Sequence, residues 1–298
     1  MKKVLFLGCN ESQMDYLKAL KDDDWHVVGT DLNLYAPGKN VCDKFYNCGY
    51  DSIKELIAIG RKEGFTKTDK VFTASAQFAH LGASLFAEEF SIPYASRKTI
   101  EICLNKTQFY KYFSSLNIPI PNTYYINDEH ELNKKLKSNQ SKWYWLKSDF
   151  SKNPNYVYRF HSQSIPYDSI NWKKDRYFKE KYILQPEHHG ISLRINIYGS
   201  RFNVFDFESG KLTHKHHSEI ENLKIIDSLR KIMESLNQQN WLVKFDIILE
   251  EQNFVVLDIG LEPPFRMRNE SMRQGIRFEK YYIKQCLYGK IEYPDSLD

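Results

Sequence analysis

Cysteines are few in this sequence, and none of them forms a CxxC pair. The 298 residues contain only five: Cys9, Cys42, Cys48, Cys103 and Cys286. Their scatter argues against a zinc ribbon or a disulfide framework and is typical of a protein from a reducing compartment. Histidines occur at positions 188, 189, 214, 216 and 217. Because no carboxylate or cysteine accompanies them at the spacing of a known zinc site, we interpret them as polar loop residues, one of which could lie near a ligand.

Long apolar runs and a strong charge excess are also missing. No stretch reaches membrane-spanning length, and charged residues follow soon after the apolar run Val4–Leu7, unlike in a signal peptide. We therefore expect a cytoplasmic protein with no membrane partner. The formal net charge of +4 is too small to indicate a nucleic-acid partner, although it permits an anionic ligand. With 42% hydrophobic residues, the chain can bury a sizeable core in two or three subdomains.

The glycine pattern of a dinucleotide-binding loop is absent from the N-terminal region. Lys2–Leu7 predicts a buried strand, Ser12–Leu20 an amphipathic helix and His26–Gly29 a second strand, which together make a βαβ unit. Gly8, however, is not followed by the other glycines of a G-x-G-x-x-G motif. We expect a small α/β unit over residues 1–95 without a dinucleotide, and a dinucleotide-dependent enzyme is the weaker alternative. Further helices are expected over Ser52–Gly64 and Phe78–Phe90, and further strands over Val71–Ala74 and Ile92–Tyr94.

The remainder of the chain mixes helices and strands without a repeat or a long linker. A helix is expected over Ser96–Ile118, where Pro119 and Pro121 end it because proline cannot continue a helix. Other helices are expected over Asp128–Ser138, Glu219–Asn237 and Ile276–Leu287. Strands are expected over Thr123–Ile126, Lys142–Lys147, Tyr156–Phe160, Tyr182–Gln185, Ser192–Tyr198 and Arg201–Phe207.

Two acidic residues interrupt an apolar hairpin near the C-terminus. The strands Leu242–Leu249 and Phe254–Ile259 carry Asp246 and Asp258 in otherwise apolar runs. In a hairpin that turns near Gln252, residues whose numbers sum to about 504 face each other, so the two aspartates are predicted to be cross-strand neighbours. Two like charges so placed repel each other. A divalent cation between them would relieve the repulsion, and hard oxygen ligands suit Mg²⁺.

Two lysines upstream are candidates for binding an anion. Lys147 ends the apolar strand that begins at Lys142, and the polar loop Ser148–Asn155 that follows could lie over a phosphate chain. The alternative for this segment is an ordinary exposed hairpin. Lys106 lies in the middle of the predicted helix Ser96–Ile118, where a solvated helix lysine is the simpler interpretation.

The order of these segments resembles the ATP-grasp superfamily, in its carbamoyl phosphate synthetase-like, carboxylate–amine ligase branch. The segments that carry the resemblance are LNKTQFYKYFSSLNIPIPNTYYI, WYWLKSDF, YILQPEHHG and VKFDIILEEQNFVVLDIGLEPPFR. The resemblance implies α/β and α+β architecture: an N-terminal Rossmann-like preATP-grasp domain followed by a two-lobed ATP-grasp fold. The implied boundaries are 1–95 for the first domain, 96–185 for a central (lid) subdomain with its leading helix, and 186–298 for a C-terminal subdomain with the metal site.

The resemblance also implies roles for individual residues. Lys106 and Lys147 would hold the phosphates of ATP, and Asp246 and Asp258 would ligate Mg²⁺ or, alternatively, Mn²⁺. Arg266 would face a substrate carboxylate or the transferred phosphate and act in catalysis with Lys147. The adenine and ribose would lie against Gln185, Pro186, Glu187 and Ser192, and the anionic substrate would meet Arg194, Arg266 and Arg268. For the arginines near position 268, exposed residues on a turn and helix are the simpler interpretation.

The activity implied by the resemblance is ATP-dependent carboxylate–amine ligation with release of ADP. A small-molecule carboxylate would be activated as an acyl phosphate and joined to an amine. Two departures from the family pattern stand out: Ser148–Asn155 contains no glycine, and Gly260 stands where an asparagine is expected. They keep open the alternative of a nucleotide-binding protein that has lost or altered catalysis and acts as a partner or regulatory subunit. The sequence does not reveal the oligomeric state; a homodimer is one option, because symmetric dimers are the commonest oligomers.

Overall fold

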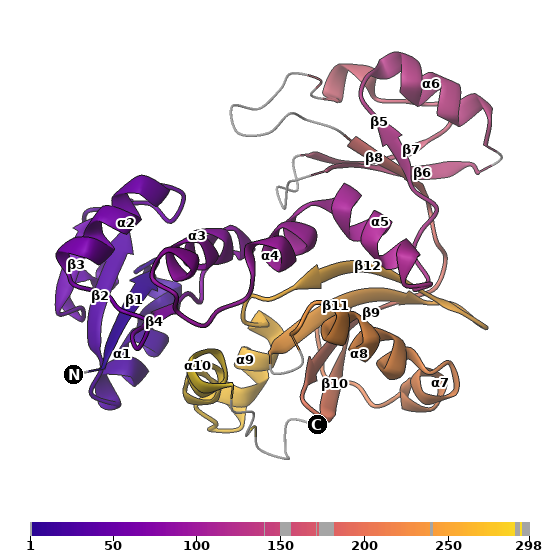
Figure 1. Ribbon diagram of the computed structural model, residues 1–298. Helices are drawn as coiled ribbons and strands as arrows, with labels where there is room; N and C mark the ends of the chain where they lie inside the picture. The colour runs from indigo at the N-terminus through magenta and orange to yellow at the C-terminus, as the bar shows by residue number, and fades with distance from the viewer. Residues whose placement is uncertain are drawn as a thin grey trace.

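Three four-stranded sheets organise the molecule, as a computed structural model shows (Figure 1). The structure describes residues 2–139, 141–149, 156–170, 172, 182–238, 241–289 and 293. Within these residues, the strand orders are β3-β2-β1-β4 in the N-terminal sheet, β5-β8-β6-β7 in the middle sheet and β10-β9-β11-β12 in the C-terminal sheet. No helix among them is long and apolar enough to cross a membrane.

The N-terminal sheet is parallel and has both faces covered. Its strands are β1 (Lys3–Leu7), β2 (His26–Asp31), β3 (Lys44–Asn47) and β4 (Lys70–Phe72). The helices that follow them are α1 (Met14–Asp22), α2 (Ile53–Lys62) and α3 (Gln77–Glu89). The predicted α/β unit is therefore present. The strand expected at Ile92–Tyr94 was wrong, because this segment pairs with no strand, and β3 is an edge strand that the pattern did not reveal.

One face of this sheet is closed by the C-terminal helix α10 (Phe278–Tyr288). Tyr282 of α10 packs edge-on against Tyr16 and Phe72, with ring centroids 6.0 and 5.9 Å away. A region almost three hundred residues from the N-terminus thus completes the N-terminal core. The adjacent α9 (Phe265–Arg273) links α10 back to the C-terminal sheet.

The helix expected over Ser96–Ile118 is two helices, α4 (Arg97–Leu104) and α5 (Lys106–Ser115). Asn105 separates them with an extended backbone, φ −102° and ψ 112°, and its side chain accepts a hydrogen bond from the Gln108 amide at 2.7 Å. Asparagine at this position caps a new helix instead of continuing the old one. Lys106 is therefore the first residue of a helix and not, as predicted, a mid-helix residue.

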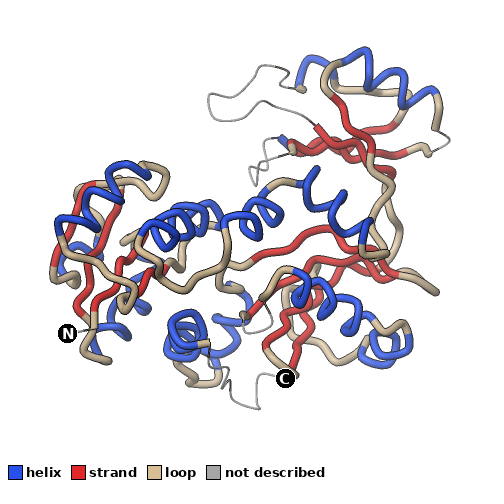
Figure 2. Tube along the Cα trace, viewed as in Figure 1, coloured by secondary structure: helices blue, strands red, loops and turns tan. Residues whose placement is uncertain are grey.

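The middle sheet is antiparallel and forms the lobe drawn at the top of Figures 1 and 2. It contains β5 (Tyr124–Ile126), β6 (Trp143–Ser148), β7 (Val157–His161) and β8 (Tyr182–Pro186). Helix α6 (Glu129–Lys137) packs on it through Leu132 and Leu136. Most of the predicted phosphate loop, residues 150–155, lies outside the described residues.

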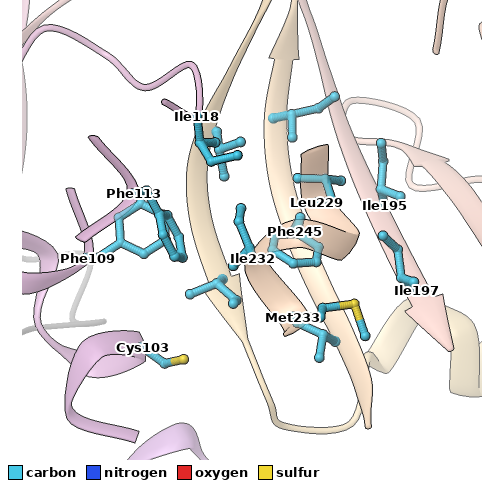
Figure 3. Close-up of a cluster of buried hydrophobic side chains, with 14 of the residues drawn as sticks. Cys103, Phe109, Phe113, Ile118, Ile195, Ile197, Leu229, Ile232, Met233 and Phe245 are labelled. Atoms are coloured by element: carbon cyan, nitrogen blue, oxygen red, sulfur yellow. The ribbon is translucent and has the colours of Figure 1, made fainter. Parts of the chain in front are cut away.

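The C-terminal sheet is also antiparallel, and helices cover its apolar face. Its strands are β9 (Ile191–Tyr198), β10 (Arg201–Asp206), β11 (Leu242–Leu249) and β12 (Phe254–Gly260). The helix expected over Glu219–Asn237 is divided into α7 (His217–Asn222) and α8 (Ile225–Ser235), because Lys224 takes a left-handed conformation with φ 50°. The core that these elements share with α5 is shown in Figure 3, and it includes Phe109, Leu229, Ile232, Met233 and Phe245.

Candidate active site

The two aspartates of the hairpin face each other, as the sequence predicted. Asp246 of β11 pairs with Asp258 of β12, and the register then shifts, so that Ile247 pairs with Val256. Leu257 is the extra residue of this β-bulge. Bulges occur frequently beside functional sites, because they redirect side chains. Here the bulge lies directly beside Asp258.

Both aspartates line a cleft between the middle and C-terminal sheets. The cleft has a volume of about 400 Å³, and among the described residues its charged lining comprises four basic and three acidic side chains: Lys106, Lys147, Arg194, Lys244, Asp246, Asp258 and Glu262. Val157, Ser192, Phe207 and Leu257 complete the lining. Lys106, Lys147 and the two aspartates come from three separate parts of the chain, so only the folded structure brings them together.

Each acidic side chain of the cleft has a basic neighbour. Arg194 donates two hydrogen bonds to Asp246, at 2.7 and 2.8 Å. The Lys244 ammonium lies 2.6 Å from Glu262, and the Lys106 ammonium lies 3.6 Å from Asp258. The bidentate Arg194–Asp246 pair restrains both side chains. These pairs offset the repulsion between acids that the hairpin would otherwise bring together.

Lys147 is a half-buried charge of the cleft. Its ammonium donates a hydrogen bond to Gln185 Oε1 at 3.0 Å. Burial, and secondarily the positive charge of Lys106, lower the pKa of Lys147 to about 8. The ammonium is thus poorly solvated and available to an anion, which is the state expected of a phosphate-binding lysine.

Asp149 connects the two lysines, a role that the sequence did not reveal. Its backbone carbonyl accepts the Lys106 amide at 2.8 Å, and its carboxylate accepts the Thr107 amide at 2.6 Å and the Asn105 side chain at 3.0 Å. A carboxylate at a helix N-terminus is stabilised by the free amides there. Because Asp149 lies two residues after Lys147, this cap holds the end of β6 against the start of α5.

An adjoining cavity of about 300 Å³ shares Lys147, Val157, Ser192 and Leu257 with the cleft. Its other lining residues are Pro121, Trp145, Gln185, Pro186, Glu187, His188 and Ile248. All four residues predicted to contact the base and ribose, Gln185, Pro186, Glu187 and Ser192, are therefore in this lining. Apolar side chains form one part of its lining and polar or charged side chains the other.

Two side chains of this cavity differ from the expectation. The Gln185 amide is already engaged, since it donates to Thr123 Oγ1 at 2.8 Å while its oxygen accepts from Lys147. The Glu187 carboxylate is held by Arg159 at 2.7 and 3.0 Å. A hydrogen bond that the sequence did not reveal, between His188 Nδ1 and Glu250 Oε1 at 2.9 Å, brings a further acid close to the cavity.

The arginines predicted to bind substrate lie in three settings. Arg194 is in the cleft, and its guanidinium lies 5.3 Å from the ring centroid of Phe207. Arg266 stacks on the same ring at 4.6 Å and donates to the carbonyls of Asp206 and Phe207 at 3.0 and 2.9 Å. Arg268 lies elsewhere, because it bonds the Asp15 carboxylate at 2.6 Å and the Ser12 carbonyl, which joins α9 to the N-terminal unit. The structure thus brings Arg268 into a contact between elements and not into the cleft lining.

The carboxylates of the cleft are suited to a metal ion only if substrate phosphates supply further ligands to that ion. Among the described residues, no three histidine, cysteine, aspartate or glutamate side chains gather closely enough to hold a metal by themselves. Mg²⁺ is typically held by one or two carboxylates together with substrate phosphates. Asp246 and Asp258, on one wall of a cleft that carries Lys106 and Lys147, meet this requirement.

Solved structures with the same architecture cover almost the whole chain. The biotin carboxylase domain of 2-oxoglutarate carboxylase from Hydrogenobacter thermophilus, in complex with MgADP, ADP and bicarbonate, has a TM-score of 0.75 at 12% identity and covers 99% of this chain and 72% of its own. The L-amino acid ligase of Bacillus licheniformis has a TM-score of 0.74 at 12% identity, over 98% of this chain and 77% of its own. The N5-carboxyaminoimidazole synthetase of Staphylococcus aureus, complexed with ADP, has a TM-score of 0.74 at 11% identity, over 98% and 78%.

The chain has the ATP-grasp fold. No protein-family model and no curated protein sequence matches it, so the similarity resides in the fold. The ATP-grasp fold accounts for the two antiparallel sheets that enclose the cleft. It also confirms the expected order, a Rossmann-like α/β unit followed by two lobes.

Proposed function

We propose that this protein is an ATP-dependent carboxylate–amine ligase that forms ADP. The observation that carries the proposal is the convergence of Lys106, Lys147, Asp246 and Asp258 on one cleft. Phosphoryl transfer chiefly requires cations and positioned groups around a phosphate chain. Two proteins with this fold give further support, because an N5-carboxyaminoimidazole synthetase and a biotin carboxylase domain have both been solved in complex with ADP.

The residues of the cleft divide naturally between nucleotide and substrate. In this proposal Lys106 and Lys147 bind the phosphates, and the adenine occupies the adjoining cavity beside Gln185 and Pro186. Ser192, which lines both cavities, would contact the ribose. Asp246 and Asp258 would hold Mg²⁺, or Mn²⁺ with the same oxygen ligands, and the metal would offset phosphate charge. Because Asp246 is paired with Arg194, a metal ion held by Asp246 would release that arginine.

The released arginine gives the reaction its carboxylate site. Arg194 and Arg266, both stacked on Phe207, would orient an anionic substrate through fork-like guanidinium contacts. The terminal phosphoryl group of ATP passes to the substrate carboxylate, which gives an acyl phosphate and ADP. An amine then displaces the phosphate and loses a proton, so that the products are ADP, inorganic phosphate and an amide.

The test measures ADP release from ATP and Mg²⁺ with a panel of small carboxylates and amines. The wild-type protein is expected to release ADP only when an accepted carboxylate is present, and Asp258→Asn is expected to reduce that rate by on the order of 100-fold or more, because a metal-ligating charge is lost. Lys18→Met, which alters an exposed lysine on α1, is the matched control and should retain the wild-type rate. Equal ADP release by wild type and Asp258→Asn would overturn the assignment.

A second candidate is a nucleotide-binding partner or regulatory subunit that has lost catalysis. The observation that favours it is the neutralisation of two cleft acids, Asp246 and Glu262, by close basic partners. This candidate predicts that a non-hydrolysable ATP analogue binds with the same affinity to wild type and Asp258→Asn, and that no carboxylate stimulates ADP release. Metal-dependent nucleotide binding together with turnover would exclude it.

A further inference from the structure

The β-bulge at Leu257 decides on which face of the sheet Asp258 lies. Up to the bulge, Val256 of β12 pairs with Ile247 of β11. Continued without an extra residue, this register would give Asp258 the partner Phe245, which is fully buried in the core of the C-terminal sheet. A shift of one residue moves a side chain to the other face of a strand, because side chains alternate along it. The bulge therefore keeps Asp258 in the cleft and out of the apolar core.

Helix α5 contacts this bulge from the outer edge of β12 (Figure 1). Because β12 is an edge strand, the polar backbone groups on its outer side need partners from outside the sheet. The Tyr110 hydroxyl of α5 donates a hydrogen bond to the Leu257 carbonyl at 2.7 Å, and the Val256 amide donates to the Pro119 carbonyl at 2.9 Å. Burial raises the pKa of Tyr110, so its hydroxyl keeps the proton that it donates. Two backbone groups at the bulge are thus bound by α5 and the segment that follows it.

The same helix positions both the lysine and the carboxylate that face each other in the cleft. Lys106 is the first residue of α5, and its ammonium lies 3.6 Å from Asp258. One turn later, Tyr110 holds the residue that precedes Asp258. The Tyr110 ring is buried and packs against Phe109, so a phenylalanine at this position would keep the packing and lose only the hydroxyl. A buried carbonyl that loses its donor costs free energy, which would favour a register without the bulge.

We propose that Tyr110 is a positioning residue for metal binding: its hydroxyl holds the bulge at Leu257 and thereby keeps the Asp258 carboxylate beside that of Asp246. This inference rests on the proposed function, in which the two aspartates hold the metal ion that accompanies the nucleotide. Tyr110 acts through the backbone of β12 and does not line the cleft. Its hydroxyl also lies beside Gln185, which lines the cavity for the base, so the test must separate the metal from the base.

The test measures how much Mg²⁺ strengthens nucleotide binding. Isothermal titration calorimetry gives the dissociation constant of the full chain for a non-hydrolysable ATP analogue, once with Mg²⁺ and once with excess chelator, and the ratio of the two constants reports the contribution of the metal. Tyr110→Phe should lower this ratio by about tenfold or more, the loss typical of a residue that orients a metal ligand, and leave the constant in chelator unchanged. The matched control is Tyr282→Phe, because Tyr282 is equally buried and donates to the Leu261 carbonyl at 2.9 Å, outside the bulge. It should keep the wild-type ratio.

The possible outcomes separate the inference from the proposed function. A wild-type ratio in folded Tyr110→Phe, or an equal loss of affinity with and without Mg²⁺, overturns the inference and leaves the proposed function standing; the second result would mean that Tyr110 acts on the base cavity. The same loss of the ratio in Tyr282→Phe also overturns the inference. A wild-type protein that does not bind the analogue, or binds it equally with and without Mg²⁺, overturns the proposed function and the inference with it. Circular dichroism verifies folding, and if Tyr110→Phe is unfolded, Tyr110→Met and Tyr282→Met replace the pair.

Discussion

The N-terminal and C-terminal sheets use apolar residues in different ways, and the difference explains where the chemistry lies. In β1 the consecutive residues Val4, Leu5, Phe6 and Leu7 are all buried, because helices cover both faces of the parallel sheet. In β11 buried residues alternate with half-buried ones, so that Phe245 and Ile247 face the helices while Lys244 and Asp246 face the cleft. A sheet with one open face can carry charged groups on a rigid frame.

The largest expected effect is on the covered face of the C-terminal sheet. Phe245 is fully buried against α8 (Figure 3), so Phe245→Ala should lower the free energy of unfolding by about 3–5 kcal/mol. Phe207→Ala is the matched control on the open face, where the ring is 40% exposed, and should cost about 1 kcal/mol or less. Urea denaturation followed by circular dichroism measures both. Equal losses would contradict the division of the sheet into a packing face and a chemical face.

Nucleotide binding in the cleft should respond to pH through Lys147, which reaches the cleft from β6 of the middle sheet. Its pKa of about 8 lies below the ordinary value because burial disfavours the charged form. Below pH 8 the ammonium is charged and the dissociation constant for ATP should not change on its account. Above pH 8 the free protein loses this proton, so the dissociation constant should rise by up to about tenfold per pH unit.

Lys147→Arg is the control for this pH dependence. Arginine remains protonated throughout the range, so the rise above pH 8 should disappear while binding persists. Isothermal titration calorimetry between pH 7 and pH 9.5 makes the comparison. A rise of the same size in both proteins would show that another group titrates.

A smaller effect is expected at the helix that carries Lys106. Asn105→Ala removes the cap of α5 and a contact to Asp149, and it should cost about 1 kcal/mol of stability. It should also raise the dissociation constant for ATP on the order of threefold to tenfold, since Lys106 begins this helix. Asp128→Ala removes a comparable cap from α6, where Asp128 accepts the Glu131 amide at 2.8 Å. It should cost similar stability and leave ATP binding unchanged; a loss of affinity in both would refute the local role of Asn105.

The smallest effect on nucleotide binding is expected in the N-terminal sheet. Asp31 accepts the amides of Cys9 and Asn33 at 2.7 and 2.8 Å, so its carboxylate orders the loops at the ends of β1 and β2. Asp31→Asn should cost about 1 kcal/mol of stability and change the dissociation constant for ATP by less than about twofold. A loss of affinity greater than tenfold, measured by the same calorimetry, would indicate that the parallel sheet takes part in nucleotide binding.

Local pattern predicted the parts of the site that depend on one hairpin. The period of two and the position of the turn placed Asp246 and Asp258 within one residue of each other, and the bulge at Leu257 brings them into direct register. The same period could have included Lys244, which lies two residues before Asp246 and so on the same face. The helix breaks at Asn105 and Lys224 were missed, because apolar periodicity continues across both and only the cap and the left-handed backbone reveal them.

The sequence by itself determined the apolar strands, the hairpin that carries the two aspartates and the order of segments that resembles ATP-grasp proteins, because these follow from periodicity and from residues close in the chain. Only the tertiary structure decided which charges meet. Asp149 joins β6 to α5, Arg194 pairs with Asp246, and Arg268 turns toward Asp15. These contacts link residues from 42 to 253 positions apart. Their geometry depends on how the sheets and helices pack, and no local pattern contains that information.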